Sequence, residues 1–228
     1  IEMVCGPHAS SIDYFHNDGE RVHAGEVLMK VVAPTQLLLT AERTALNLLC
    51  HLSGIATATA SWVDAVTGTG AIIRDTRKTT PGLRFLDKYA VKIGGGSNHR
   101  FGLYDMIMLK DNHIDYAGGL SAALERTHAY LQDHKLDLKV EVEVRSLDEL
   151  TELLTIDHPY DRIMLDNFTP EALKVALTLI PSTVETEASG GITEETIRAY
   201  AETGVQFISV GALTHSVKAL DMSLKAQL

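Results

Sequence analysis

The stretch KVEVEVRSLDELTELLTIDHPYDRIMLDN, residues 139–167, alternates strand and helix signals. Valines alternate with glutamates over residues 140–144, which is the two-residue period of a β-strand. Ser146 and Glu149 form a capping-box sequence, which predicts that a helix starts there. A second apolar run, residues 162–167, follows that helix. A strand, a helix and a second strand in this order indicate a parallel sheet.

The same alternation extends over most of the chain from residue 71 onward. Thr169 before Pro170 predicts another helix start, and Thr193 predicts a helix that ends at Gly204. We expect seven strands, each a short apolar run that ends in polar or glycine-rich residues: 71–73, 90–96, 105–112, 139–144, 162–167, 184–191 and 207–214. We therefore predict an α/β fold and favour a TIM-like β/α barrel, open or incomplete, over a doubly wound sheet.

The N-terminal part has a different pattern. Residues 18–33 read as short strands with turns, and residues 40–68 have helical periodicity. Gly54, inside the helical stretch, marks either a helix end or a close approach of another backbone. We expect a small β-rich unit that leads into a long helix.

Composition excludes several classes of protein. The chain has 228 residues, a net charge of −10 and 45% hydrophobic residues. No apolar run is long enough to span a bilayer, and no secretory signal is visible. The acidic balance argues against nucleic-acid binding. Cys5 and Cys50 lie far apart without partners at metal-binding spacing, so we expect free, reduced thiols and a cytoplasmic location.

Positive charge is nevertheless concentrated in one window. Residues 74–113 contain eight Lys or Arg residues and four Asp residues, a net charge of +4, so the other 188 residues total −14. The segment RDTRKTTPGLR, residues 74–84, carries four of these cations. A basic island in an acidic protein indicates a focused anion site rather than a surface for a polyanion.

Polar residues and glycine-containing turns follow the predicted strands. In β/α barrels the reactive groups lie at these C-terminal ends of the strands. They are Arg77, Lys78, Asn98, His99, Arg100, Lys110, Asp111, Asn112, Glu143, Asp166, Asn167, Ser189, Gly190, Gly191, Gly211, Ala212 and Leu213. The early strands supply cations, and the later strands supply small residues whose backbone N–H groups can approach a phosphate. Glu141 and Glu143 face one side of their strand together, which is costly unless cations or a metal neutralise them.

Eight motifs in order across nearly the whole chain resemble the quinolinate phosphoribosyltransferase family, the carboxylating nicotinate-nucleotide pyrophosphorylases of NAD synthesis. They are ERTALNLL (42–49), DTRKTTPGLR (75–84), KIGGGSNHRFGL (92–103), LKDNH (109–113), VEVEV (140–144), LDN (165–167), EASGGI (187–192) and VGALTHS (210–216). One glycine run alone would say little, but the ordered set is specific.

The resemblance implies a domain organisation. Residues 1–50 would be the later part of an N-terminal α/β sandwich domain, which is longer in family members. Residues 51–214 would form the phosphoribosyltransferase barrel, and residues 215–228 a C-terminal tail that returns to the N-terminal domain. In the family the sandwich domain packs against the barrel of a partner subunit, so the resemblance implies a homodimer with shared active sites, or a higher oligomer.

The resemblance also implies a role for each matching residue. The acceptor, quinolinate, would be held by Arg43 from the neighbouring subunit and by Thr76, Arg77, His99, Arg100 and Lys110. The donor, phosphoribosyl pyrophosphate, would be held by Lys78, Glu143 and Asp166, with its 5-phosphate near Ser189, Gly190, Gly191, Gly211, Ala212, Leu213 and His215. Lys78, Lys110, Glu143 and Asp166 would act in catalysis, and Glu143 and Asp166 would bind Mg²⁺, partly through substrate or water.

The implied reaction is phosphoribosyl transfer to quinolinate with loss of carbon dioxide, giving nicotinate mononucleotide and pyrophosphate. The partners would be these small molecules, without nucleic acid or membrane. The cation-rich lining fits, because planar guanidinium groups bind carboxylates through two parallel hydrogen bonds.

Three alternatives stay open at the level of sequence. A related phosphoribosyltransferase could share the fold and use another acceptor, such as nicotinate. A Schiff-base lyase on the same barrel could use Lys110 or Lys92 as its nucleophile. More remotely, GERVHAGEVLMKVVAP, residues 19–34, is similar to the hairpin of biotinyl or lipoyl carrier domains, which would make Lys30 the modified lysine.

Overall fold

The computed structural model describes residue 4 and residues 11–227. The prediction for the Cys5 thiol lies outside this part, whereas Cys50 is a half-buried free thiol. The N-terminal unit is a two-stranded antiparallel sheet, β1 (Ser11–Tyr14) and β2 (Met29–Val32), which precedes the 31-residue helix α2 (Thr35–Ala65). The predicted β-rich unit and long helix are therefore present, although only the last part of residues 18–33 forms a strand.

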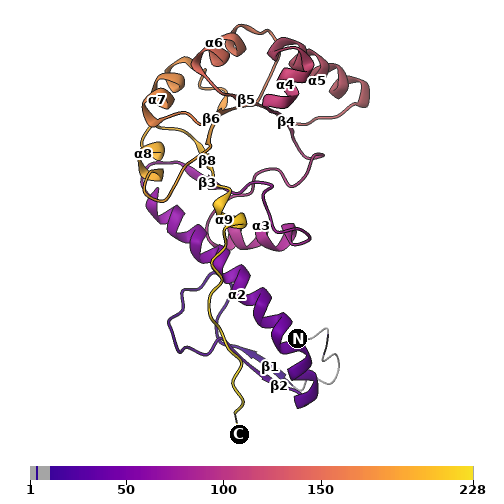
Figure 1. Ribbon diagram of the computed structural model, residues 1–228, viewed down its shortest axis with the longest axis vertical. Helices are drawn as coiled ribbons and strands as arrows, with labels where there is room; N and C mark the ends of the chain where they lie inside the picture. Colours follow the sequence, from indigo (N-terminus) through magenta and orange to yellow (C-terminus); the bar gives the residue numbers. More distant parts are fainter. Residues whose placement is uncertain (1–3, 5–10, 228) are drawn as a thin grey trace.

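Glycine 54 lies in the middle of α2, where glycine costs about 1 kcal/mol relative to alanine. A Cβ at Gly54 would lie 2.5 Å from the carbonyl oxygen of Lys218, so the second reading of this glycine, a close backbone approach, is correct. The C-terminal segment runs along α2 toward the β1–β2 unit (Figure 1). The N–H of Leu220 donates to the carbonyl oxygen of Cys50 at 3.1 Å and fixes this contact.

Six parallel strands form the main sheet, in the order β3-β8-β7-β6-β5-β4. They are β3 (Ile72–Arg74), β4 (Ile107–Leu109), β5 (Val140–Val144), β6 (Arg162–Asp166), β7 (Glu185–Ser189) and β8 (Phe207–Ser209). The sheet curls into a ring with helices on its outside, and the ring is open between β3 and β4, which do not pair with each other in the described residues (Figure 1). The prediction of an open β/α barrel is confirmed.

The helices follow the strands along the chain and pack outside them. They are α3 (Arg84–Ile93), α4 (Asp111–Ala117), α5 (Leu120–His134), α6 (Leu147–Thr155), α7 (Pro170–Leu179), α8 (Ile197–Ala201) and α9 (Ala212–His215). The Ser146 hydroxyl caps α6 by accepting from Glu149 N–H at 3.2 Å, and Thr169 caps α7 by accepting from Ala172 N–H at 3.3 Å. The third predicted start is displaced, because α8 begins at Ile197 rather than beside Thr193.

The predicted strand at residues 90–96 is wrong. Residues 90–93 belong to α3, and a glycine turn follows, so the part of the chain that the structure describes contributes six strands to this sheet rather than seven. A Cβ at Gly94 would lie 2.6 Å from the Cβ of Thr59, and one at Gly96 would lie 2.8 Å from Cγ2 of the same threonine. The glycines are therefore present because α3 and α2 pack with their backbones close together.

Replacing Gly94 by alanine should destabilise the protein by about 1–3 kcal/mol, because the added methyl group has no space between α3 and α2. The urea midpoint of unfolding measures this effect. Lys92→Ala, at an exposed position of α3, is the matched control and should leave the midpoint nearly unchanged. Equal midpoints for Gly94→Ala and the wild type would contradict this account of the glycine run.

The two faces of the sheet differ in chemistry. Val142, Val144, Ile163 and Leu165 belong to the apolar core that includes residues of the outer helices. The alternate positions carry charge, since Glu141, Glu143, Arg162 and Glu187 are all buried. No helix in the described residues has both the length and the apolar character that a membrane crossing requires.

Candidate active site

Two acids and a lysine meet at the C-terminal ends of three adjacent strands. Lys110 directly follows β4, and its Nζ lies 2.5 Å from Oε2 of Glu143 on β5. Asp166 ends β6, the next strand, and pairs in register with Ser189 of β7. Burial raises the pKa of Asp166, the charge of Glu143 raises it further, and Lys110 partly offsets both effects. The site therefore contains negative charge that a further cation would stabilise.

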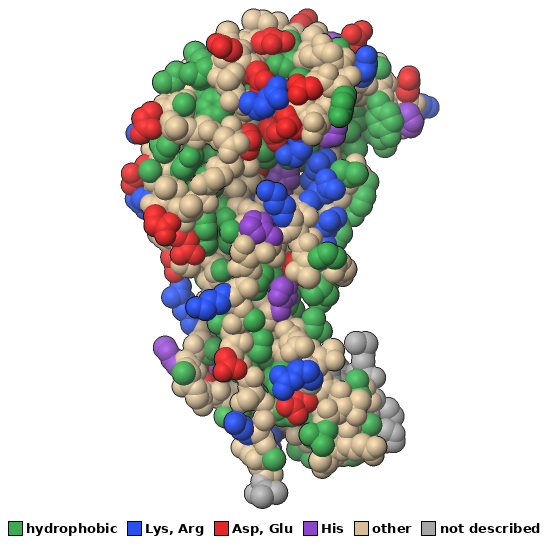
Figure 2. Space-filling model, viewed as in Figure 1, with side chains coloured by type: hydrophobic (Ala, Val, Ile, Leu, Met, Phe, Trp, Pro, Cys, Tyr) green, Lys and Arg blue, Asp and Glu red, His purple; other side chains and the backbone are tan. Residues whose placement is uncertain are grey.

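Arg100 and Arg77 supply the positive half of the site. Arg100 is buried and donates from Nη1 to the carbonyl oxygen of Met106 at 3.0 Å. Burial lowers the pKa of Arg100, and the charge of Arg77 lowers it further, which means that the two guanidinium groups act on the same region. Figure 2 shows Lys and Arg side chains gathered over the middle of the ring, beside acidic ones. An anion between the two arginines would relieve their repulsion.

His99 faces protein groups at both ring nitrogens. Its Nε2 lies 3.0 Å from Oε2 of Glu141 and 3.3 Å from Oε1 of Glu187, and its Nδ1 accepts the Arg100 N–H at 2.7 Å. Burial disfavours the charged ring, but the two acids outweigh this and raise the pKa of His99 to about 9. The Arg100 contact, however, requires an Nδ1 without a proton. The geometry therefore corresponds to the neutral Nε2–H tautomer, and charging the ring has to break the bond to Arg100.

Lys78 lies beside the residues that follow β8, the last strand of the barrel in sequence. Its carbonyl oxygen accepts from the Thr214 hydroxyl at 2.8 Å, which ties the loop after β3 to α9. A Cβ at Gly211 would lie 3.1 Å from both Cδ of Lys78 and Cδ2 of His215, so these three predicted residues lie together. Thr76 supports the same loop, because its hydroxyl accepts the Lys78 N–H at 3.0 Å.

The glycines after β7 are required by the backbone. Gly190 has φ +90°, and a Cβ there would lie 2.7 Å from Cγ of Asn167. Gly191 has φ +62° with open space around it, so its backbone can be approached closely. Gly190 and Gly191 thus form a turn without side chains directly after Ser189, and the role of this turn as a phosphate site stays a prediction. Leu213 buries its side chain in the core, which leaves only its main chain for a ligand.

The structure does not bring Arg43 to these strand ends. Arg43 is exposed in the first half of α2, eight residues and about 12 Å along the helix axis before His51, whose ring contacts Asp87 of α3. Its predicted role was to reach into a neighbouring subunit, and this stays a prediction.

Sequence reasoning missed a network of charges inside the ring. Glu187 contacts Arg162 Nη1 at 3.4 Å and Arg74 Nη1 at 3.5 Å and accepts from the Ser209 hydroxyl, while Glu141 lies 3.6 Å from Arg162. The alternation of residues within a strand predicted that acidic side chains face inward, but it did not predict which side chains they contact. Donor atoms of His99, Glu141 and Glu187 lie within 4.8 Å of one another. We assign no metal there, because Arg74 and Arg162 already balance the two carboxylates.

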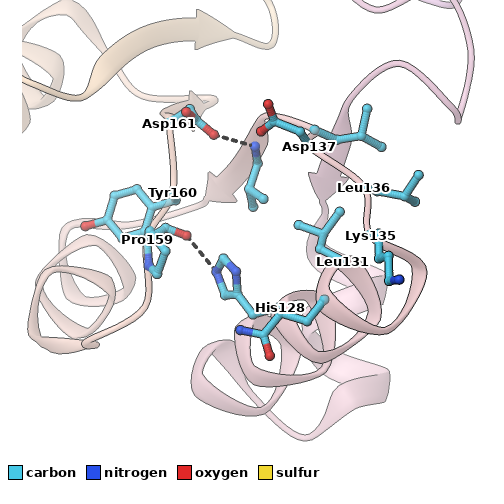
Figure 3. Close-up of a pocket in the computed structure, with 11 residues that line it drawn as sticks. His128, Leu131, Lys135, Leu136, Asp137, Pro159, Tyr160 and Asp161 are labelled. Atoms are coloured by element: carbon cyan, nitrogen blue, oxygen red, sulfur yellow. Dashed lines mark hydrogen bonds between the residues drawn. The ribbon is translucent and has the colours of Figure 1, made fainter.

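A cavity of about 400 Å³ lies at the opposite end of the strands (Figure 3). The second half of α5, the segment between α5 and β5, the start of β5 and the residues just before β6 line it, and His128 Nε2 lies 2.7 Å from the carbonyl oxygen of Pro159. Asp161 accepts the Val140 N–H at 2.7 Å, at the N-terminal end of β5. None of the predicted site residues within the described part of the chain lines this cavity, so we do not assign it to the active site.

Comparisons with known proteins agree with this geometry. Residues 55–225 match the C-terminal domain model of quinolinate phosphoribosyl transferase, and residues 1–53 match the N-terminal domain model. The chain is 48% identical to the carboxylating nicotinate-nucleotide pyrophosphorylase of Mycobacterium leprae, over 98% of this chain and 78% of the relative. It is 47% identical to the mitochondrial quinolinate phosphoribosyltransferase (decarboxylating) 2b of Nicotiana tabacum, over 94% of this chain.

The chain spans 64% of the length of the tobacco relative. The crystal structure of NadC from Streptococcus pyogenes is similar with a TM-score of 0.87 at 43% identity, over 95% of this chain and 75% of that one. The structure from Francisella tularensis, a nicotinate-nucleotide pyrophosphorylase, has a TM-score of 0.89 at 39% identity, over 96% and 76%. The chain belongs to the quinolinate phosphoribosyltransferase family.

Proposed function

We propose that this protein transfers the phosphoribosyl group of phosphoribosyl pyrophosphate to quinolinate, with decarboxylation to nicotinate mononucleotide. The observation that carries the proposal is the juxtaposition of a cationic half and an acidic half at one end of the barrel. Arg77 and Arg100 form the cationic half. Glu143 and Asp166, on adjacent strands, form the acidic half. Two anionic substrates that must meet in one pocket require such a lining, since their own charges repel.

The acceptor carboxylates bind the cationic half. The guanidinium group of the buried Arg100 is oriented before substrate arrives by its bond to the carbonyl oxygen of Met106, and the ring of His99 holds the Arg100 backbone N–H. Arg77 is exposed and can close onto the second carboxylate. A bidentate guanidinium–carboxylate pair fixes the plane of the pyridine ring and aims its nitrogen at the sugar.

The donor binds the acidic half and the turns of the late strands. The bare backbone of Gly190 and Gly191, with Gly211, takes the 5-phosphate, and Lys78 neutralises the pyrophosphate. Glu143 and Asp166 stabilise the positive charge that develops on the ribose as pyrophosphate leaves. Lys110, held against Glu143, keeps that carboxylate in place and contributes a cation on the acceptor side.

Mg²⁺ would be held by Glu143 and Asp166. Oxygen donors are the ligands that Mg²⁺ prefers, and it usually binds through one or two carboxylates together with substrate phosphates. The negative charge at Asp166 and Glu143, which Lys110 and Lys78 offset only in part, fits this role. When bound, the ion supplies charge neutralisation for the leaving pyrophosphate.

The nitrogen of quinolinate attacks the anomeric carbon of the ribose, and the bond to pyrophosphate breaks. The adjacent carboxylate then leaves as carbon dioxide, because the new pyridinium nitrogen stabilises the electron pair that remains on the ring carbon, and this carbon takes up a proton from water. No covalent bond to the protein is needed. Nζ of Lys110 lies 2.5 Å from Glu143, and this ion pair would have to break before the nitrogen could act as a Schiff-base nucleophile. Lys30 lies inside β2 opposite Asp13 rather than in a turn, unlike a carrier lysine.

The test is an assay with Mg²⁺, quinolinate and phosphoribosyl pyrophosphate. We expect carbon dioxide and pyrophosphate in equal amounts, with nicotinate a poor substitute for quinolinate. Equal turnover of nicotinate, without carbon dioxide, would overturn the acceptor assignment and leave a related phosphoribosyltransferase as the better reading.

We further propose a homodimer in which Arg43 of each chain completes the partner's acceptor site. The exposed position of Arg43, away from the strand ends of its own chain, supports this arrangement. The expected domain boundary at residues 50 and 51 falls inside α2, so we propose that α2 joins the two domains as one continuous element. The cytoplasmic location stays a prediction.

A further inference from the structure

Helix α3 buries two adjacent charged side chains, Asp87 and Lys88. Asp87 is 0% exposed and Lys88 is 1% exposed, although such residues are almost never fully buried unless they are paired. Neither side chain is part of the site described above. Their partners show that they serve two different loops.

Lys88 binds the segment that carries His99 and Arg100. Its Nζ lies 2.6 Å from Oδ1 of Asp75 and donates to the carbonyl oxygen of His99 at 3.2 Å. The same Asp75 oxygen accepts the His99 N–H at 2.8 Å. With its amide nitrogen turned toward these groups, Asn98 also donates to Oδ2 of Asp75 at 3.0 Å and to the carbonyl oxygen of Lys88 at 2.9 Å. Three side chains thus hold one short segment.

This segment needs such support because it lies beside β3, at the open edge of the sheet, and belongs to no strand ladder in the part of the chain that the structure describes. The strands β3 and β4 do not pair with each other in the described residues, and residues 97–100 lie between them in sequence. A single bridge between Ser97 and Arg74 replaces a strand ladder. Arg100 is therefore positioned mainly by side-chain hydrogen bonds.

Asp87 binds the other loop. Its Oδ2 accepts the Thr80 N–H at 2.8 Å, and its Oδ1 lies 2.9 Å from Nε2 of His51 on α2. Thr80 follows Lys78 by two residues, in the loop that also carries Arg77. Asp87 therefore fixes the end of the loop that contributes residues to both halves of the site, Arg77 for the acceptor and Lys78 for the donor.

We propose that Asp87 and Lys88 are positioning residues with separate duties. Lys88, together with Asp75, sets Arg100 in the acceptor half, and Asp87 sets the loop of Arg77 and Lys78, which serves acceptor and donor. The kinetic part of this inference rests on the proposed function. The two neighbours on one helix should therefore give different kinetic signatures, which a general loss of packing would not produce.

The first experiment compares Lys88→Met with Asp87→Asn. Lys88→Met should raise the KM for quinolinate about 10- to 100-fold, as expected for the loss of hydrogen bonds from a charged group, and leave the KM for the donor within about twofold. Asp87→Asn should raise the KM for the donor about 10-fold, with the KM for quinolinate also raised. Lys92→Met, at an exposed site on the same helix, is the control and should change neither constant.

A second variant guards against unfolding. Lys88→Met leaves the buried Asp75 unpaired, which is strongly destabilising, whereas replacing both partners of a buried pair is often tolerated. The double variant Asp75→Asn with Lys88→Met should therefore recover stability and still show the raised KM for quinolinate, because the bond to His99 is missing. Recovery of both stability and a normal KM would overturn the role of Lys88.

Amide hydrogen exchange tests the inference without activity. Asp87→Asn should accelerate exchange of the Thr80 amide and spare that of His99, and the double variant should accelerate the His99 amide and spare that of Thr80. If the wild type fails to convert quinolinate, the proposed function falls and this exchange pattern still decides the positioning roles. The separate duties would be contradicted if both variants accelerated exchange at both amides. They would also be contradicted if both variants raised both KM values by the same factors.

Discussion

Arg100→Ala is expected to weaken quinolinate binding by on the order of 2–5 kcal/mol, the cost of truncating one partner of a buried charge pair. In Kd this is roughly 30-fold to a few thousand-fold. The effect is large because Arg100 is only 9% exposed and its guanidinium group is oriented before binding by the bond to Met106, while His99 holds its backbone N–H. Without Arg100, an acceptor carboxylate would lose its buried guanidinium partner, and Arg77 and Lys110 would be the cations left on the acceptor side.

Calorimetric titration with quinolinate, in the absence of donor, measures this loss directly. Arg126→Ala is the control, since Arg126 is exposed on α5 and should leave the affinity unchanged. Arg100→Lys should recover only part of the affinity, because an ammonium group cannot form two parallel hydrogen bonds with one carboxylate. If Arg100→Ala changes only the affinity for the phosphoribosyl donor, the division of the pocket into two halves is wrong.

Much of the fold could be predicted because strand and helix periods differ. The valines of β5 and the capping residues Ser146 and Thr169 are local signals, and each lies where the pattern placed it. The prediction of a strand at residues 90–96 was wrong for a local reason as well. Residues 90–93 are an apolar run too short to separate strand from helix by period, and the glycines after it reflect helix packing rather than a strand end.

The candidate site could be predicted only in part. Residues that follow strands, such as Lys110 and Asp166, meet because parallel strands end at one edge. Partners across the ring give no such signal. Arg74 and Glu187 are 113 residues apart in sequence, and Asp87 and Lys88 look like an ordinary charged pair on an exposed helix. Periodicity indicates which face a side chain occupies, but it does not identify the group opposite.

Glu187→Ala should lower the free energy of unfolding by about 3–5 kcal/mol, the usual cost of removing one member of a buried ionic group. Glu187 is fully buried between Arg162, Arg74 and His99, on the side of the sheet away from the helices. Its removal leaves the buried Arg162 and the partly buried Arg74 with one carboxylate fewer between them. Equilibrium unfolding in urea measures the change.

The matched control is Glu185→Ala, two residues earlier on the same strand and also paired with Arg162. The Glu185 side chain is 32% exposed, so its loss should cost about 1 kcal/mol or less.

A pH series adds an independent readout. Burial opposes the charge of Glu187, but bonds from His99, Ser209 and Arg162 outweigh it and lower the pKa below 4.5. This stabilisation is present above pH 4.5 and is lost as the pH falls through the lowered pKa, so Glu187→Gln should flatten the acid limb of the stability curve. Equal costs for Glu187→Ala and Glu185→Ala, with unchanged acid limbs, would show that the charges inside the ring do not hold it together.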